Sequence, residues 1–222
     1  MAGRSSRIRG TNVRFDTDQA VALLCERDPK LASLIARVGE FRLKLDPAAT
    51  PFQALSESII YQQISGSAAS AIAGRFCERV GAGCFPSPEL VLEASDAVLR
   101  GVGLSRGKCA ALRDLASKSL DGTLPEMRRL RAMEDEAIVE RLSVVRGIGR
   151  WTAEMFLIFR LGRPDVLPVH DYGVRKGFQR AFRTREIPEP ESVARRGERW
   201  RPFRTVASWY LWRSLDGAAA VE

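Results

Sequence analysis

The sequence predicts an all-α fold, and three observations support this prediction. A side chain that can cap a helix precedes a proline at Asp28-Pro29, Thr50-Pro51 and Ser87-Pro88, which is typical of helix starts. Apolar residues then recur at the helical period, as they do through residues 52–64. Glycines suited to a left-handed C-terminal cap follow the periodic stretches, at Gly39, Gly81, Gly122 and Gly162.

The same signals place the elements in chain order. The predicted helices cover residues 17–26, 29–38, 51–63, 66–80, 88–94, 96–101, 106–120, 134–143, 149–161, 172–182, 190–199 and 202–215. The second helix begins after Asp28 at Pro29 and ends before Gly39. The third begins after Thr50, which has the spacing of a capping box with Gln53. Only residues 41–45 alternate like a strand, and a strand of that length cannot form a sheet alone.

Composition excludes several classes of protein. Of the 222 residues, 45% are hydrophobic and 28% are charged, which does not fit a disordered chain, a collagen-like repeat or a small disulfide scaffold. The length favours one domain or two small ones. Residues 1–14, which we expect to be a flexible basic tail, lack the apolar region of a signal peptide, and no apolar run reaches membrane-spanning length. Since the four cysteines match no metal or disulfide framework, we expect reduced thiols in a cytoplasmic protein with no membrane partner.

Positive charge is concentrated in one third of the chain. The net charge is +8, and residues 141–213 contain 16 Lys and Arg against 7 Asp and Glu. Such a surplus is typical of proteins that bind polyanions, because neutralisation of phosphates supplies most non-specific affinity for nucleic acid. A compositional origin stays open, since 30 of the 35 basic residues are Arg, as a GC-rich genome can produce.

A helical hairpin is the most specific local signal. Residues 142–156 read as a helix, the turn Gly147-Ile148-Gly149, and a second helix that begins with Arg150 and includes Thr152. Two glycines around one apolar residue permit a tight turn that leaves the backbone N–H groups at a helix N-terminus uncovered for phosphate oxygens, while Ile148 packs into the core. A lone Gly-x-Gly also occurs as an ordinary helix cap and turn. The prediction of a phosphate-binding hairpin therefore depends on the longer sequence that continues through Trp151, Thr152 and Ala153.

Four stretches resemble one known family. They are residues 52–81 around Tyr61-Gln62-Gln63-Ile64-Ser65, Arg146–Ala153, Leu167–Tyr172 and Arg199–Arg204. In order and spacing the chain resembles the helix-hairpin-helix DNA glycosylases of base-excision repair, and within them the bacterial 3-methyladenine DNA glycosylase II (AlkA-like) branch. The resemblance implies two helical subdomains with the active site in the cleft between them. It also implies a monomer that hydrolyses the N-glycosidic bond of 3-methyladenine or 7-methylguanine type bases in double-stranded DNA.

The expected subdomains follow from this resemblance. One covers residues 52–163 and contains the hairpin at about 134–161, and the other combines residues 15–51 with residues 164–222. Better-known relatives in this branch carry an additional N-terminal mixed α/β domain. The residues before Phe52 are too few and too helical to form it, so we expect a minimal form that lacks this domain.

Asp171 is the candidate catalytic residue. Cleavage of an N-glycosidic bond develops positive charge on the deoxyribose, which a fixed carboxylate stabilises. Asp171 also stands where a predicted helix begins, so a helix cap is an alternative from the residues alone. Its position matches the catalytic aspartate of the family, and the two roles are compatible.

Trp151 determines the kind of glycosylase that the resemblance implies. Bifunctional members have a lysine at this position, whose amine forms a Schiff base and leads to strand cleavage. The indole of Trp151 cannot do this, and the adjacent Arg150 stays protonated. No Cys follows residue 109, so the iron–sulfur loop of other members is absent as well. The resemblance implies a monofunctional hydrolase without AP lyase activity, and a packing role beneath the hairpin is the alternative for Trp151.

Further side chains are expected to line the base pocket or to contact DNA. Beside Trp151, the pocket candidates are Trp212, Tyr172, Met155 and His170, with Met155 where relatives can have tyrosine. His170 is the only histidine and makes a poor metal site. The DNA-binding candidates are Gln62, Gln63, Gly147, Ile148, Gly149, Arg150, Thr152, Arg175 and Lys176. Gln63 matches the family position whose side chain wedges into the stack when a base is flipped out, although polar residues also simply end an amphipathic helix.

No cofactor is expected to be required. The resemblance implies that the backbone carbonyls of Ser143, Val145 and Gly147 hold a structural Na⁺ or K⁺ at the hairpin. Two other functions stay open at this point. A non-catalytic helix-hairpin-helix module would bind DNA without needing Asp171, and a metal-dependent nuclease would need clustered carboxylates, whereas those near the hairpin are scattered.

Overall fold

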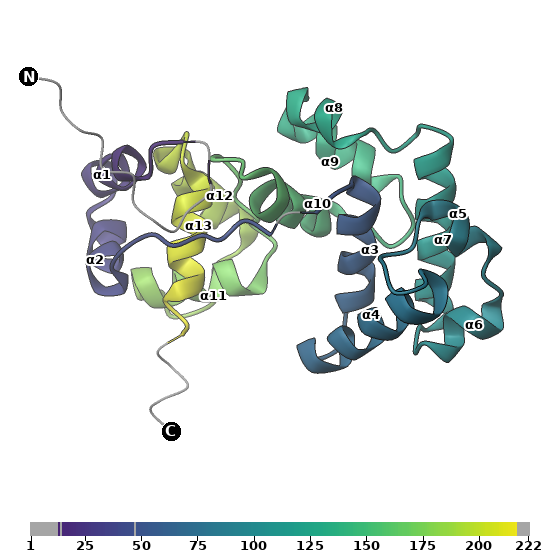
Figure 1. Cartoon of the computed structure of the whole chain (residues 1–222). Helices are drawn as coiled ribbons and strands as arrows, with labels where there is room; N and C mark the ends of the chain where they lie inside the picture. The colour runs from purple at the N-terminus through teal and green to yellow at the C-terminus, as the bar shows by residue number, and fades with distance from the viewer. Residues whose placement is uncertain (1–12, 14, 47, 217–222) are drawn as a thin grey trace, which may run out of the picture. The chain divides into compact units, whose positions relative to one another are not determined.

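The computed structural model describes residue 13, residues 15–46 and residues 48–216, and the described chain is helical (Figure 1). The prediction of an all-α fold is confirmed. The expected tail at residues 1–14 lies outside the described residues except for Val13. Among the helices that the structure describes, none is long and apolar enough to cross a membrane.

The chain forms two compact units. We call Pro47–Phe156 the central unit, and Met1–Asp46 together with Leu157–Glu222 the terminal unit. The helices of the central unit are α3 (Pro51–Tyr61), α4 (Gly66–Val80), α5 (Pro88–Glu93), α6 (Asp96–Gly101), α7 (Arg106–Leu120), α8 (Met127–Ala132), α9 (Asp135–Ser143) and α10 (Arg150–Phe156). The terminal unit contains α1 (Thr17–Arg27), α2 (Pro29–Val38), the π-helix η1 (Leu157–Leu161), α11 (Tyr172–Phe182), α12 (Pro190–Gly197), the 3₁₀-helix η2 (Glu198–Trp200) and α13 (Arg204–Arg213).

The division between the units differs from the expected one at residue 163. The π-helix η1 groups with the terminal unit, because the carbonyl of Phe159 accepts a hydrogen bond from Asp46 N–H at 2.9 Å. The ring of Phe159 also stacks on Trp212, with centroids 5.8 Å apart. The hydrophobic period alone could not reveal this, since it runs without a break through the predicted helix at 149–161.

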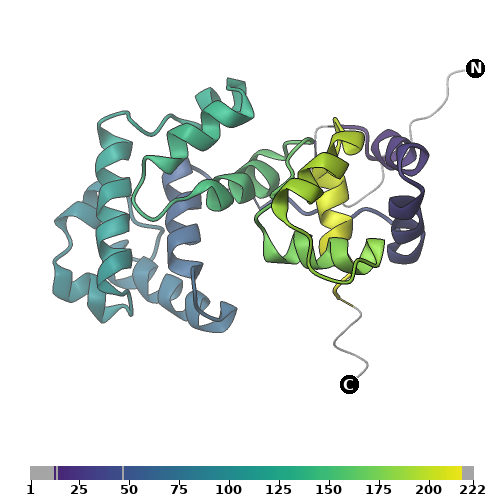
Figure 2. The ribbon, with the colours of Figure 1, turned by 180° about the vertical axis from the view of Figure 1, so that it is seen from behind.

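In the central unit, α7 packs against α3 and α5, and both views show α3 and α7 as neighbours (Figures 1 and 2). The apolar side chains between these helices are fully buried, among them Ile59, Ile60, Leu112 and Leu115. Helix α8 is the one the sequence missed. Of its residues only Leu130 is buried, and no side chain caps its start. The sequence therefore shows neither a hydrophobic period nor a capping residue that would predict this helix.

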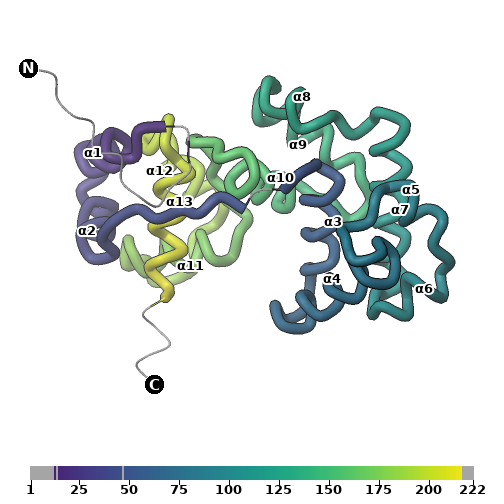
Figure 3. Tube along the Cα trace, viewed as in Figure 1, coloured from purple at the N-terminus to yellow at the C-terminus, as the bar shows by residue number. Residues whose placement is uncertain are grey.

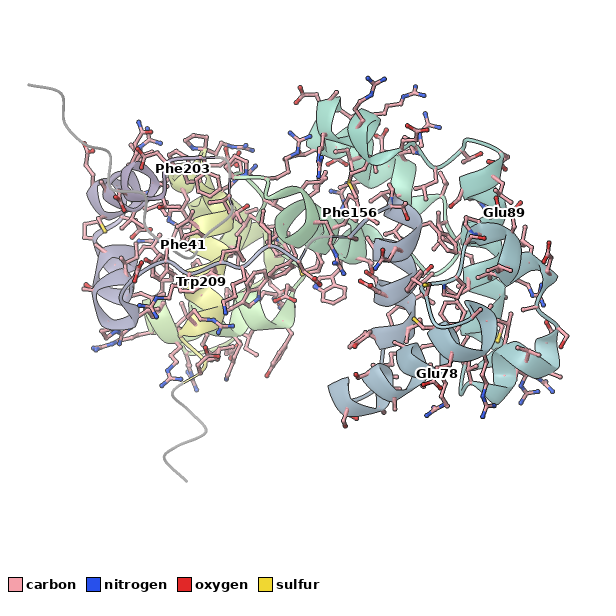
Figure 4. All side chains as sticks on the ribbon, in the orientation of Figure 1. Phe41, Glu78, Glu89, Phe156, Phe203 and Trp209 are labelled. Atoms are coloured by element: carbon pink, nitrogen blue, oxygen red, sulfur yellow. The ribbon has the colours of Figure 1, made fainter. Side chains whose placement is uncertain are left out.

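In the terminal unit, α13 packs against α11 and α2. The tube in Figure 3 shows the segment after α2 crossing α13, and the rings of Phe41 and Trp209 are in contact there. Residues 41–45 form no strand, but their alternating pattern correctly indicated which side chains are buried. Phe41 and Leu43 are buried in the core. The centroid of the Phe41 ring lies 5.0 Å from that of Trp209 (Figure 4).

Most predicted helix boundaries agree with the structure because their caps are local. Thr50 Oγ1 accepts from Gln53 N–H at 3.1 Å, whereas the Gln53 side chain accepts from Ala49 N–H and leaves the capping box incomplete. Gly81 is not left-handed, with φ of −105°, contrary to the expectation. A glycine is needed there for space, because a Cβ would lie 2.0 Å from the carbonyl oxygen of Cys84.

Candidate active site and nucleic-acid interface

Asp171 joins the start of α11 to the C-terminal helix within the terminal unit. It is the N-cap of α11, and its Oδ1 accepts from Val174 N–H at 2.7 Å. The same Oδ1 accepts from Trp212 Nε1–H on α13 at 2.8 Å. The cap and the indole therefore fix the carboxylate in one orientation, and the role of helix cap considered for Asp171 is confirmed.

Gly173 makes this contact possible, although no motif of the sequence points to it. A Cβ on Gly173 would lie 2.9 Å from Cδ1 of Trp212 and 3.0 Å from Oδ1 of Asp171. Any side chain larger than hydrogen would push the indole away from the carboxylate. The available signal was a glycine in the first turn of a helix, where it is a poor helix former unless space demands it.

The remaining candidates of the terminal unit differ in accessibility. Tyr172 is 65% exposed, and His170 is exposed as well. Arg175 and Lys176 are half-buried and have partners within the unit: Arg175 Nε donates to the carbonyl of Pro188 at 2.8 Å, and Lys176 Nζ donates to Gln179 Oε1 at 2.8 Å. These two side chains would have to change partners to reach a phosphate.

The hairpin of the central unit has the predicted turn geometry. Gly147 is exposed with φ of +80°, a conformation that favours glycine, while Ile148 is 3% exposed and packs into the core. The backbone ladder of α10 begins with Ala153 N–H bonding to Gly149 O, so the N–H groups of Gly149 and Arg150 precede it. Thr152 is buried, which leaves the turn backbone as the accessible part of the predicted phosphate site.

Arg150 is held by acidic neighbours. Both terminal nitrogens of its guanidinium bond to the carboxylate of Glu136, and Glu154 lies 4.0 Å away. The hydrogen bonds with Glu136 raise the pKa of Arg150 and lower the pKa of Glu136. Arg150 is half exposed, so a phosphate would compete with Glu136 for it.

Trp151 and Met155 lie one helical turn apart on α10. Trp151 is 47% exposed, whereas the core indoles of Trp200 and Trp209 are 0% and 8% exposed. This difference argues against a Trp151 that is fully packed beneath the hairpin and shows that the indole is accessible. Met155 is half-buried.

The two glutamines after α3 have different surroundings. Gln62 Nε2 donates to the carbonyl of Gly147 at 3.0 Å and so ties the loop to the hairpin. Gln63 is exposed and has a left-handed φ of +58°. Gln63 is thus the accessible residue at the tip of the α3–α4 loop, while Gln62 anchors this loop to the hairpin.

The hairpin carbonyls named for a cation are hard oxygen donors. Val145 O also accepts from Ile148 N–H at 3.0 Å, and Gly147 O from Gln62, which leaves each oxygen one further lone pair. Across the described ranges, no group of three or more His, Cys, Asp or Glu side chains could hold a metal ion.

These features define a helix-hairpin-helix protein with an accessible tryptophan after the turn and a carboxylate fixed by an indole. Residues 57–202 match the family described as HhH-GPD superfamily base excision DNA repair protein. The chain is 35% identical to DNA-3-methyladenine glycosylase 1 of Schizosaccharomyces pombe, over 84% of this chain and 82% of the relative. The chain therefore belongs to the HhH-GPD superfamily of base excision DNA repair proteins, and the predicted family is confirmed.

Solved structures agree with this assignment. A DNA-3-methyladenine glycosidase from Bacillus halodurans superposes with a TM-score of 0.83 at 37% identity, covering 93% of this chain and 94% of that one. The 3-methyladenine DNA glycosylase of S. pombe in complex with abasic DNA superposes with a TM-score of 0.79 at 34% identity, covering 87% of this chain and 95% of that one.

Proposed function

We propose that this protein is a monofunctional DNA glycosylase that removes alkylated bases of the 3-methyladenine and 7-methylguanine type from double-stranded DNA. It acts as a monomer and requires no cofactor. The single observation that supports this most is the carboxylate of Asp171, oriented by the α11 backbone and the Trp212 indole. The names of the similar proteins described above, each a 3-methyladenine DNA glycosylase or glycosidase, support the substrate class.

The chemistry needs little beyond this carboxylate. A base alkylated at N3 or N7 is positively charged, and it leaves as a neutral molecule because it takes the electron pair of the C1′–N bond. The sugar becomes cationic, and the negative charge of Asp171 stabilises it until water attacks C1′ and loses a proton. Since the leaving group is already activated, no general acid is needed.

The aromatic side chains supply recognition. An indole attracts a cationic ring by stacking and by a cation–π interaction of about 0.5–2 kcal/mol. Trp151 and Trp212 are the indoles assigned to this role, with Tyr172, Met155 and His170 as further pocket residues. Because Trp151 occupies the position of the Schiff-base lysine, the product is an intact abasic site.

One pair of incubations tests the proposal against its alternatives. Methylated duplex DNA is incubated with the protein in EDTA and, in parallel, in Mg²⁺ without EDTA, and released bases and strand breaks are measured. We expect methylated purines in the supernatant, intact strands until alkali is added, and no protein–DNA adduct trapped by borohydride. Binding without release would support a non-catalytic module, nicking that EDTA abolishes would support a nuclease, and a trapped adduct would contradict the monofunctional assignment.

We also propose that a Na⁺ or K⁺ ion bound by the carbonyls of Ser143, Val145 and Gly147 supports the hairpin, since such oxygens suit these ions. DNA affinity should then be higher in K⁺ or Na⁺ than in tetramethylammonium at equal ionic strength. Equal affinity in all three salts would contradict this.

A further inference from the structure

One side of α7 supports both loops that the family resemblance assigns to DNA, namely the α3–α4 loop and the hairpin turn. Lys108, Ala111 and Asp114 follow one another at three-residue spacing and therefore lie on the same side of the helix. Each of them meets a different part of the α3–α4 loop or of the hairpin. All these residues belong to the central unit.

Lys108 holds the end of α3. Its Nζ donates to the carbonyls of Ile60 at 2.7 Å and Gln62 at 2.8 Å. The last carbonyls of a helix lack partners within the helix, and a positive charge is favourable at this end. Burial lowers the pKa of Lys108, as expected for an ammonium group enclosed by protein.

The hairpin rests on the next turns of α7. A Cβ built on Gly147 would lie 3.5 Å from the methyl group of Ala111, an ordinary packing distance. Asp114 Oδ2 accepts from the backbone N–H of Arg146 at 2.7 Å, and Lys118 bonds to the other oxygen of Asp114. The side chain of Gln62 then bridges the two loops through Gly147 O.

Gln63 lies at the tip of this arrangement. Its φ of +58° is unfavourable for a residue with a side chain, so the tip keeps this conformation only while its neighbours are held. The carbonyl of the preceding residue is held by Lys108, and its side chain is held by the hairpin. Release of these anchors would let Gln63 relax to an ordinary backbone conformation.

We infer that Lys108 and Gln62 are positioning residues that present Gln63 as a preformed wedge, in register with the phosphate-binding hairpin. The inference rests on the proposed function and on the wedge role that the family resemblance implies for Gln63. A loop that is already ordered loses less backbone entropy when its side chain enters the stack. Because the stack has a vacant place only where a base is missing, the wedge favours abasic DNA.

The test compares affinity for an abasic duplex with affinity for an undamaged duplex, both titrated on the same preparation so that any inactive fraction cancels. Gln63→Ala should lower the preference for abasic DNA. Lys108→Met should lower it about tenfold, the equivalent of one hydrogen bond to a charged group. The double variant should show no further loss than Gln63→Ala alone, because both changes remove the same wedge.

Arg113→Met is the matched control. Arg113 is also a basic residue of α7 that donates to backbone carbonyls, those of Leu92 and Ala94, but it holds the α5–α6 connection. It should leave the preference unchanged. An unchanged preference in Lys108→Met, or additive losses in the double variant, would overturn the positioning role.

Base release by the wild-type protein is measured in parallel. If bases are not released at all, the proposed function fails, whatever the binding data show. If they are released but Gln63→Ala keeps the full preference for abasic DNA, Gln63 is not a wedge, and the positioning role falls with it.

Discussion

At the residue scale, one oxygen of Asp171 receives two hydrogen bonds, and this has consequences for mutation. An amide side chain has the shape of the carboxylate and can accept the same bonds from Val174 N–H and Trp212 Nε1–H. Asparagine is also as good an N-cap as aspartate. Asp171→Asn therefore keeps both bonds to Oδ1, removes the negative charge, and replaces the second carboxylate oxygen by an NH₂ donor.

Asp171→Asn should lower the rate of base release by about 100- to 1000-fold, since removal of one electrostatic stabiliser of a transition state has this effect. Thermal unfolding and duplex affinity should stay close to wild type. Single-turnover release from methylated duplex DNA, with a melting curve of the same sample, checks both statements. Release at the wild-type rate would leave Asp171 as a helix cap only.

Gly173→Ala should separate geometry from charge at the same place. The added methyl group meets the indole of Trp212 at 2.9 Å and displaces it from Asp171, while alanine favours the helix. We expect base release to fall by about tenfold or more, because displacements of this kind near reacting groups are costly. The tryptophan fluorescence emission should shift as well. Gly74→Ala on α4 is the control, because a Cβ there meets nothing within 4 Å, and it should change neither the rate of base release nor the emission.

At the scale of elements, close contact between α11 and α13 depends on a second glycine of α11. A Cβ on Gly177 would lie 2.1 Å from the carbonyl oxygen of Leu211, and backbone cannot rotate away as a side chain can. Gly177→Ala should lower the free energy of unfolding by about 2–3 kcal/mol through overpacking. Gly74→Ala, in open space, should raise it by about 0.5–1 kcal/mol. Urea denaturation of the two variants provides the comparison, and equal stabilities would contradict the packing argument.

Asp28 links three elements of the terminal unit. It is fully buried, caps α2 through Leu31 N–H, and accepts from Arg196 at 2.7 and 2.8 Å and from Trp200 Nε1–H at 3.0 Å. Burial acts to raise the pKa of Asp28, but the hydrogen bonds from Arg196 and Trp200 outweigh it, so the pKa is lowered. The sequence had indicated only the cap.

A lowered pKa makes stability depend on pH in a defined direction. The contribution of Asp28 is complete above the unfolded-state pKa of about 3.9 and is lost as the pH falls through the lower folded-state value. Asp28→Asn should cost about 3 kcal/mol at neutral pH and make the acid limb of stability shallower. Asp96→Asn, which breaks an exposed pair with Arg113, should cost less than about 1 kcal/mol. The free energy of unfolding is measured between pH 7 and pH 3. If it fell in parallel for wild type and Asp28→Asn, the lowered pKa of Asp28 would not account for the acid dependence.

At the scale of the whole molecule, the net charge of +8 predicts strongly salt-dependent binding to DNA. The logarithm of the affinity should fall linearly with the logarithm of the salt concentration, with a slope of about −0.9 per neutralised phosphate. Glu136→Gln should strengthen binding and steepen the slope by about one, because it releases Arg150 for a phosphate.

Glu78→Gln, on the exposed side of α4, removes the same charge without releasing Arg150 and serves as the control. Fluorescence anisotropy across a salt series gives both quantities. A slope that is the same in the two variants would show that Arg150 does not reach the DNA.

Several features could be predicted from the sequence because they depend on neighbours along the chain. The capping oxygens of Asp28, Thr50 and Ser87 bond to N–H groups three residues later, so the helix starts were visible without any tertiary information. The turn Gly147-Ile148-Gly149 was likewise visible. The short helix α8 and the end of the central unit were not, since packing rather than local preference decides them.

The sequence by itself therefore determined the all-α class, the hairpin, the family and Asp171 as the residue to examine. The tertiary structure decided how these residues are held: Trp212 reaches Asp171 across 41 positions, and Arg196 reaches Asp28 across 168. It also decided that the side chain of Gln62 bonds to the hairpin carbonyl of Gly147, whereas Gln63 is exposed with a left-handed backbone. The physical reason is range. Caps and hydrophobic periods act within one or two helical turns, whereas the contacts that orient the Asp171 carboxylate or hold the α3–α4 loop join segments whose proximity exists only after the helices have packed.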